Sequence, residues 1–196
     1  MKEFKSEKRL NKIVTTLKQR QFDLMVVLEN IHDPHNVSAI FRTCDAVGIP
    51  KVSLVYTIEK FPKIGKKSSA SAFKWVEREK YKSIESCYDE LRKNGFKIYA
   101  SSINNDSKNI YEIDLAEKVA IVLGNEHRGV SEQAARLADE RIVIPMFGMV
   151  QSLNVSVAAA IILYEACRQR IVKGKYNNSH ISESELERLI EQWCSK

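Results

Sequence analysis

The sequence predicts an α/β fold built on a parallel β-sheet, and three observations lead to this prediction. Short apolar runs, typical of strands buried on both faces, recur along the chain and alternate with longer segments of helical periodicity. Glycine stands where helical segments end, at Gly48 and in the pair Asn94-Gly95. The length of 196 residues and the hydrophobic content of 44% suit one domain with a substantial core.

The first quarter of the chain contains clear elements. Residues 4–20 place apolar side chains at near-helical spacing among basic ones, which predicts an amphipathic helix. Residues 24–28 and 52–56 have the apolar composition of buried strands. Between these strands, residues 37–47 are expected to form a helix that ends at Gly48.

A long basic loop is expected over residues 57–74, and strands and helices alternate again after it. The expected helices cover residues 84–93, 132–138 and 153–172, and a last one runs from a capping box of Ser182 and Glu185 to Trp193. The expected strands cover residues 96–100, 119–123 and 141–144.

Composition and short motifs argue against several classes of protein. The four cysteines form no Cys-x-x-Cys pair, so we expect reduced thiols and no zinc ribbon. Neither Gly-x-Gly-x-x-Gly nor Gly-x-x-x-x-Gly-Lys-Ser/Thr occurs, so neither a Rossmann-type cofactor site nor a P-loop is expected. No apolar run is long enough to cross a membrane and the start lacks an apolar signal region, so we expect a cytoplasmic protein without a membrane partner.

The net charge of +6 is unevenly distributed. Residues 1–21 carry +5 and residues 51–82 carry +6, so the rest of the chain carries −5. Two basic segments are expected of a surface that follows a phosphate backbone. The alternative is that these charges only solvate helix faces. Because two separate segments share the bias, we favour contact with RNA.

The run of residues 144–170 predicts a ligand site. A strand ends at Pro145, and the loop that follows is polar. This loop contains Gly148, Gln151, Ser152 and Asn154. The next helix opens with small residues, at Ser156 and at positions 158–160, which allow another backbone to come close. Polar side chains and free N–H groups at a helix start are suited to hold a polar ligand.

Three blocks of sequence together indicate a family. Residues 34–48 read Pro-His-Asn-Val-Ser-Ala-Ile-Phe-Arg-Thr-Cys-Asp-Ala-Val-Gly, and residues 121–130 read Ile-Val-Leu-Gly-Asn-Glu-His-Arg-Gly-Val. The run of residues 144–170 contains Met-Val-Gln-Ser-Leu-Asn-Val-Ser-Val-Ala. In order and spacing these blocks resemble the three signature motifs of the SpoU class of SPOUT RNA methyltransferases, and they are most similar to those of its TrmH-type members.

The resemblance implies a SPOUT-type parallel sheet, with the C-terminal part of the chain tied into a deep trefoil knot that holds the methyl donor. It implies a basic N-terminal helical extension at residues 1–21, a SPOUT methyltransferase domain at residues 22–172 and a C-terminal helical extension at residues 173–196. Such enzymes are usually homodimers with active sites near the subunit interface.

The resemblance also implies a reaction. The methyl group of S-adenosylmethionine is expected to go to an RNA ribose 2′-hydroxyl. The resemblance favours the ribose of the guanosine at tRNA position 18, and no metal ion is expected to take part. One alternative is a methyltransferase for another tRNA nucleotide or for rRNA. The other is an RNA-binding module without catalysis. Loss of the motif residues would favour this module, but these residues are present here.

Five residues match the family's catalytic positions: Arg42, Asn36, Glu126, Ser152 and Asn154. Arg42 follows Asn36 by six positions, so the two are not stacked on one helix face. The role of Arg42 stays open between a general base and a cation clamp, because arginine normally keeps its proton. Ser152 is either a site residue or the helix N-cap, and Asn154 is favoured as a site residue. For Glu126 the alternative role is to cap the turn between Gly124 and Gly129, and the two roles can coexist.

The remaining assignments concern the donor and the RNA. The residues expected to offer backbone groups and apolar walls to the donor are Leu123, Gly124, Ile144, Met149, Ser152 and Leu153. The basic residues expected to contact RNA are Lys8, Arg9, Lys66, Lys67, Lys74 and Arg168. Trp75 either stacks on a base or belongs to the core. His32, His35 and His127 lack the spacing and companions of a metal site.

Overall fold

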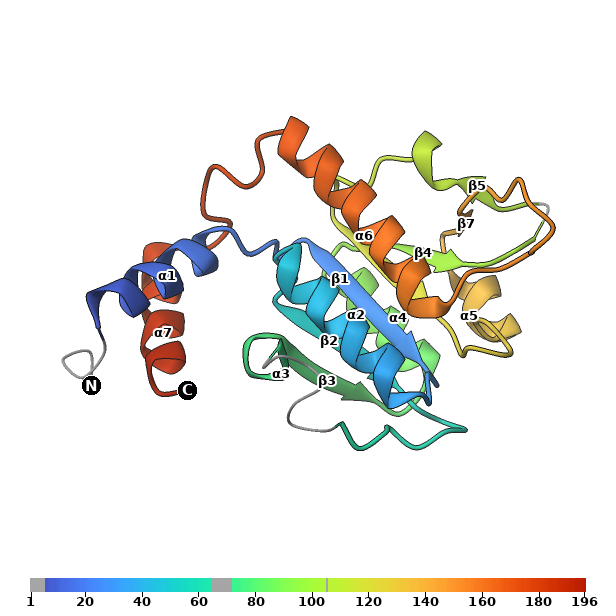
Figure 1. The fold of residues 1–196 in the computed structure, drawn as a ribbon, viewed down its shortest axis with the longest axis horizontal. Helices are drawn as coiled ribbons and strands as arrows, with labels where there is room; N and C mark the ends of the chain where they lie inside the picture. The colour runs from blue at the N-terminus through green and yellow to red at the C-terminus, as the bar shows by residue number, and fades with distance from the viewer. Residues whose placement is uncertain (1–5, 65–71, 105) are drawn as a thin grey trace.

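The computed structural model describes residues 6–64, 72–104 and 106–196, and its centre is a seven-stranded sheet in the order β3-β2-β1-β6-β4-β7-β5 (Figure 1). The strands are β1 (Leu24–Glu29), β2 (Lys51–Val55), β3 (Glu77–Tyr81), β4 (Lys97–Ser101), β5 (Lys108–Asn109), β6 (Val119–Leu123) and β7 (Glu140–Val143). The helices are α1 (Glu7–Lys18), α2 (Pro34–Ala46), α3 (Ala72–Trp75), α4 (Ile84–Lys93), the 3₁₀ helix η2 (Ile110–Glu112), α5 (Glu132–Leu137), α6 (Val155–Val172) and α7 (Glu183–Cys194). Neighbouring strands run parallel, which confirms the predicted α/β class.

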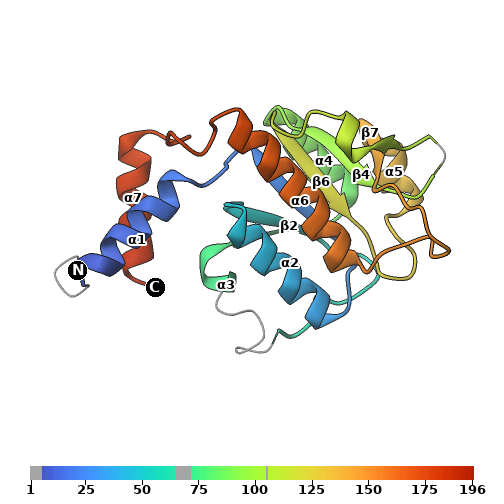
Figure 2. The same ribbon diagram turned by 45° about the horizontal axis from the view of Figure 1, so that its top comes forward.

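Helices cover both faces of the sheet (Figure 2). Alternate residues of β1 point to opposite layers. Leu24, Val26 and Leu28 belong to the core shared with α2 and α6. Met25 and Val27 belong to the core shared with α4 and α5. Because β1 lies inside the sheet and is covered on both sides, its sequence is apolar from Leu24 to Leu28.

Every expected helix and strand is present, with ends that differ by no more than three residues, but two strands were not expected. The strand β3 reads Glu-Arg-Glu-Lys-Tyr and lies at an edge of the sheet, where charged side chains remain in solvent. The second, β5, has two residues at the opposite edge. The prediction of a loop over residues 57–74 is wrong from residue 72 onward, where α3 begins, and residues 65–71 lie outside the described part of the chain.

Side-chain caps fix the start of the two helices that matter most for function. Helix α2 begins three residues earlier than predicted, because the side chain of Asp33 accepts a hydrogen bond of 2.7 Å from the backbone N–H of His35 and a proline occupies the first helical position. In α6 the cap is Asn154, which accepts from the backbone N–H of Ser156 at 2.8 Å. The alternative that Ser152 caps this helix is therefore wrong.

The two terminal helices, α1 and α7, pack against each other beyond the amino ends of the strands (Figures 1 and 2). Their shared core consists of Ile13, Leu17, Leu186, Leu189, Trp193 and Cys194. Trp75 packs against this core, with its ring centroid 4.8 Å from that of Trp193. Of the two alternatives for Trp75, the structure supports the packing role. No helix in the described ranges is long and apolar enough to cross a membrane.

Two fully buried arginines connect the terminal segments to the sheet. Arg20 pairs with Asp45 at 2.5 Å and donates to the carbonyl oxygen of Ile49 at 2.9 Å. Arg170 pairs with Asp23 and donates to the carbonyl oxygen of Leu115 at 3.2 Å. The charge of Arg20 belongs to the basic segment at residues 1–21 but is not available to RNA, because the side chain is enclosed by protein.

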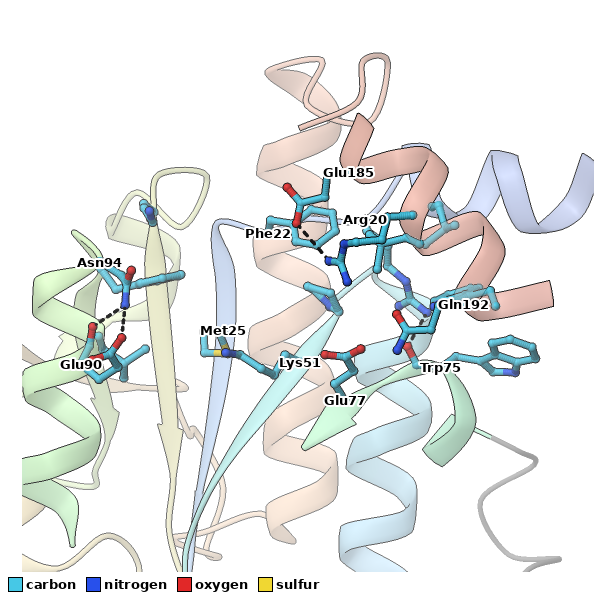
Figure 3. Close-up of a pocket in the computed structure, with 18 of the residues that line it drawn as sticks. Arg20, Phe22, Met25, Lys51, Trp75, Glu77, Glu90, Asn94, Glu185 and Gln192 are labelled. Atoms are coloured by element: carbon cyan, nitrogen blue, oxygen red, sulfur yellow. Dashed lines mark hydrogen bonds and ion pairs between the residues drawn. The ribbon is translucent and has the colours of Figure 1, made fainter. Parts of the chain in front are cut away.

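A cavity of about 610 Å³ lies between α7 and the amino ends of β1, β2 and β3 (Figure 3). Its walls combine aromatic side chains with charges of both signs, such as Trp75, Lys51 and Glu77. This cavity lies at the amino ends of the strands, at the opposite end of the sheet from the loops that follow β1, β6 and β7.

Candidate active site

The three sequence blocks meet at one edge of the sheet, where β1, β6 and β7 end. The chain leaves β1 through α2 toward β2 on one side, whereas β6 pairs with β1 on the other side. Strand order therefore reverses beside β1. In open α/β sheets, ligands bind at the carboxyl ends of strands where the order reverses. Residues 30–33, 124–131 and 144–154 form the loops at this place, and the first turn of α2 follows the first of them.

Glu126 joins two of these loops. Its Oε1 accepts hydrogen bonds from the backbone N–H of Asp33 at 3.0 Å and from Nδ2 of Asn36 at 3.1 Å. Its Oε2 accepts from the backbone N–H of His32 at 3.2 Å and lies 2.9 Å from Nδ1 of the same histidine. Glu126, which follows β6, therefore fixes the start of α2.

The same contacts determine the ionisation of Glu126. Partial burial raises its pKa, but hydrogen bonds from the Asn36 side chain and from backbone N–H groups, including those of Asp33 and His32, outweigh burial and lower the pKa to about 2. At neutral pH the side chain is a carboxylate, which only accepts hydrogen bonds. The site thus contains a fixed negative charge.

Two asparagines extend the network to the third loop. Nδ2 of Asn36 donates to Glu126, and its Oδ1 accepts from Nδ2 of Asn154 at 3.0 Å. Oδ1 of Asn154 accepts from both the backbone N–H and the hydroxyl of Ser156. Glu126, Asn36 and Asn154, which are expected from the sequence to be catalytic, are therefore brought into one chain of hydrogen bonds.

The turn after β6 is capped by Asn125. Its Oδ1 accepts from the backbone N–H groups of His127 at 3.0 Å and Arg128 at 3.2 Å. Its Nδ2 donates to the carbonyl oxygen of Asn30 at 2.8 Å, which ties this loop to the end of β1. The N–H groups of His127 and Arg128 in this turn are therefore held by Asn125.

Glycine at position 124 is required by the loop itself. A Cβ there would lie 2.0 Å from the backbone nitrogen of Val130 and 2.1 Å from the carbonyl carbon of Gly129. Side chains are not tolerated at such distances, so the two ends of the loop close only around glycine. The sequence suggested that Gly124 admits a ligand, but the close approach found here is that of the chain to itself.

Two neighbouring cavities open between these loops. The larger, of about 670 Å³, runs between the loops after β4, β6 and β7. The smaller, of about 520 Å³, lies at the start of α2 and is bordered by His32, Asn36 and Asn154. Five residues border both cavities, so the two spaces are contiguous. They are Glu126, His127, Ser152, Leu153 and Val155.

Most of the residues expected to hold the methyl donor border the larger cavity. These are Gly124, Ile144, Ser152 and Leu153. Leu123 lies fully buried in the sheet beneath the loop. Met149 is 99% exposed and is not among the described residues that border this cavity. The two cavities thus unite Ser152 with the asparagine network, but they do not include Met149.

Arg42 lies apart from the other expected catalytic residues. It is on α2 with an exposed side chain and is not among the described residues that border either cavity. Its spacing of six residues from Asn36 accounts for this, because the helix has turned its side chain to another face. The single chain therefore brings four of the five expected catalytic residues together.

The described residues expected to contact RNA lie on three different helices. Lys8 and Arg9 are exposed on α1, and Lys74 is exposed on α3. Arg168 on α6 is paired with Glu165 through two hydrogen bonds of 2.8 Å. Lys66 and Lys67 lie outside the described residues.

Two residues of the site were not indicated by the sequence as functional. His32 was considered only as a metal ligand, although it lies four positions before Asn36 and directly before the cap of α2. Asn30 has a φ of 53°. Its Oδ1 accepts hydrogen bonds from three successive backbone N–H groups in the loop after β2. These belong to Thr57, Ile58 and Glu59. An asparagine directly after a buried strand is the available signal, since asparagine tolerates this backbone conformation.

The chain is similar to a known family and to several of its members. Residues 23–164 match the model of the SpoU rRNA Methylase family. The tRNA (guanosine(18)-2'-O)-methyltransferase of Thermus thermophilus is 42% identical over 192 residues, which cover 98% of both chains. The protein of the same name from Aquifex aeolicus is 43% identical over 188 residues, or 96% of this chain and 89% of its own.

Solved structures show the same similarity. The A. aeolicus TrmH/SpoU tRNA modifying enzyme matches with a TM-score of 0.91 and 42% identity over 96% of each chain. The SpoU methyltransferase AviRb from Streptomyces viridochromogenes, in complex with the cofactor AdoMet, matches with a TM-score of 0.66 and 25% identity over 79% of this chain and 59% of that chain. The fold, the three joined loops and the family model together show that this chain belongs to the SpoU rRNA Methylase family.

Proposed function

We propose that this chain transfers the methyl group of S-adenosylmethionine to the ribose 2′-hydroxyl of guanosine 18 in tRNA. The observation that carries the proposal is the hydrogen-bonded chain of Glu126, Asn36 and Asn154, which joins three loops beside two contiguous cavities. The names of the relatives in T. thermophilus and A. aeolicus support the choice of nucleotide. We place the activity in the cytoplasm, with tRNA as partner.

The larger cavity is the proposed site of the methyl donor. Its volume of about 670 Å³ lies in the range of small-molecule sites. Ile144, Leu153 and Val155 offer apolar surface suited to an adenine ring, whereas Gln151 and Ser152 offer polar groups suited to the ribose and amino-acid parts. The similar AviRb enzyme binds AdoMet, which supports this fit. We propose no metal, because a methyl group on a sulfonium is already activated for transfer.

The smaller cavity is the proposed place of the ribose. In the reaction the 2′-oxygen attacks the methyl carbon, the new O–C bond forms as the C–S bond breaks, and the electron pair stays on sulfur. Alignment of the oxygen with the methyl group supplies much of the acceleration in such a step. Asn36 and Asn154 hold each other in place, so their amide groups border the ribose in a fixed orientation.

We propose that the active form is a homodimer and that Arg42 completes the site there. Helix α6 and the loop before it expose apolar side chains that a monomer would leave in water: Phe147, Met149, Val150, Val157 and Tyr164. From Val155 to Tyr164 the only polar residue of the helix is Ser156, and apolar side chains of this part also lie in solvent, as is typical of a helix covered by a partner. Arg42 is proposed to grip the phosphate beside the reacting ribose, because arginine is a permanent cation with a forked set of donors.

The finer architecture is also proposed from the family. The loops after β6 and β7 are inferred to form a trefoil knot around the donor. Residues 22–172 form the proposed methyltransferase domain, and residues 1–21 and 173–196 form the extensions that meet as α1 and α7. The exposed Lys8 and Arg9 of α1 suit contact with tRNA outside the reacting nucleotide.

The test is methyl transfer from labelled S-adenosylmethionine to unmodified total tRNA and, separately, to rRNA, followed by mapping of the modified nucleotide. Label at the 2′-oxygen of guanosine 18 is the expected result. Label at another nucleotide or on rRNA would keep the chemistry and reject the substrate. No label on either RNA, together with no binding of the donor, would contradict the proposed function and favour a non-catalytic RNA-binding module.

A further inference from the structure

We propose that His32 is the catalytic residue that accepts the proton of the ribose 2′-hydroxyl. This inference rests on the function proposed above and names a group that neither the family motifs nor the charge pattern indicated. Its basis is the hydrogen bond between Nδ1 of His32 and Oε2 of Glu126, and the position of the ring at the wall of the smaller cavity.

Glu126 determines which ring nitrogen of His32 is free. The carboxylate accepts hydrogen bonds only, so at 2.9 Å the Nδ1 atom of His32 is the donor. In the neutral ring Nε2 then has the lone pair. A carboxylate bonded to Nδ1 both orients the imidazole and stabilises the cation formed when Nε2 takes a proton. The carboxylate is itself held by the backbone N–H groups of His32 and Asp33 and by Asn36, so the pair is preorganised.

The position of His32 suits contact with the ribose that accepts the methyl group and not with S-adenosylmethionine. It borders the smaller cavity, with Asn36 and Asn154, and is not among the described residues that border the larger one. A methyl group held in the larger cavity would meet the 2′-oxygen where the two cavities join. The side chain of His32 is 46% exposed, so a proton taken there can pass to water after the reaction.

Nε2 of His32 takes the hydroxyl proton as the 2′-oxygen attacks, and the electron pair of the O–H bond forms the new bond to the methyl carbon. The C–S bond breaks and its electron pair returns to sulfur, which leaves S-adenosylhomocysteine. The imidazolium of His32, paired with Glu126, then releases its proton to solvent and the neutral ring is restored.

Other groups in the site are less suited to this role. The groups that face His32 are Glu126 and His127 from the loop after β6, and Asp33 from its own segment; the ring centroid of His127 lies 5.7 Å away. Glu126, with a pKa of about 2, is a weak base at neutral pH. Arg42 borders neither cavity in the described chain and is a permanent cation.

The test compares His32→Gln with wild type and with the control His35→Gln. Glutamine can still donate a hydrogen bond to Glu126 but cannot act as a base. His35 bears the same side chain three residues on, is exposed, and is not among the described residues of the cavity wall. Substrates are labelled S-adenosylmethionine and an unmodified tRNA transcript. We expect His32→Gln to lower kcat at least about 100-fold, the usual size of a general-base effect, with donor binding within about twofold of wild type.

Two further readouts separate a base from a structural role. The rise of kcat with pH across the neutral range in wild type should be lost in His32→Gln and retained in His35→Gln. Added imidazole should restore part of the activity of His32→Ala, because a free base can occupy the vacated space. A wild-type-like kcat in His32→Gln, loss of donor binding, an unchanged pH profile, or a larger loss in His127→Gln would each overturn the assignment. If wild type itself methylates no RNA, the proposed function fails first, and the role of His32 fails with it.

Discussion

Glu126→Gln offers the sharpest test of the network, because its effect on stability depends on pH in a defined direction. The pKa of Glu126 falls from an ordinary 4.5 to about 2 in the folded protein, which at full strength corresponds to about 3 kcal/mol of stabilisation. The carboxylate borders an open cavity, so solvent screens part of this, and we expect the variant to lose about 1–2 kcal/mol at pH 7. Glutamine replaces one acceptor oxygen by an NH₂ group, which then faces N–H donors.

The pH dependence follows from the direction of the shift. A lowered carboxylate pKa contributes its full stability above the unfolded pKa of about 4.5, and the contribution is lost as pH falls toward the folded pKa of about 2. Urea unfolding of wild type and Glu126→Gln should therefore show a constant gap above pH 5 that shrinks below pH 4.5. Glu187→Gln, on the exposed face of α7, is the control and should change little. A difference in the free energy of unfolding that stays constant down to pH 3 would contradict the lowered pKa of Glu126.

Four further variants test separate parts of the account. Arg42→Ala should abolish turnover with donor binding nearly unchanged, and loss of donor binding in calorimetry would contradict its role. Asn154→Ala removes the cap of α6 and the bond to Asn36, so we expect a loss of about 1 kcal/mol, or about 2–4 °C in Tm, together with most of the activity; full activity would contradict the network. Gly124→Ala should destabilise the protein by about 1–3 kcal/mol in urea unfolding, whereas Gly148→Ala, where a Cβ meets nothing within 4 Å, should be neutral; equal effects would argue against the closed loop. Tyr164→Glu should convert a dimer to a monomer in analytical ultracentrifugation, and an unchanged dimer would move the interface away from α6.

The sequence was sufficient for elements whose local pattern is strong. Residues 24–28 of β1 and all of β6 are apolar because both faces of these strands are covered, and this pattern is visible without a structure. The edge strand β3 was not predictable in the same way, because its charged residues face solvent and only pairing with β2 makes it a strand. The start of α2 lies three residues before the predicted one, because Asp33 caps the helix and Pro34 occupies its first position, whereas its first buried apolar side chain is that of Val37.

The site shows the same division between local and long-range information. The motifs identified Asn36, Glu126 and Asn154, but not that Glu126 would reach across 90 residues of sequence to Asn36. The motifs also did not show that Asn125 caps the turn after β6. The side chains of Asn125 and Glu126 can both accept hydrogen bonds from backbone N–H groups, so their chemistry does not separate them. Met149 was expected in the donor pocket from its place in the loop, and only the course of that loop in space shows its side chain in solvent.

The most direct test of the central claim uses two tRNA transcripts that differ only at position 18, one with guanosine and one with 2′-deoxyguanosine. Both are incubated with the protein and labelled S-adenosylmethionine, and incorporated methyl groups are counted. We expect close to one methyl group per guanosine-18 transcript and none on the deoxy transcript, which lacks the accepting oxygen. Equal label on both transcripts would show that the methyl group goes elsewhere, and no label on the guanosine-18 transcript would contradict the proposed reaction.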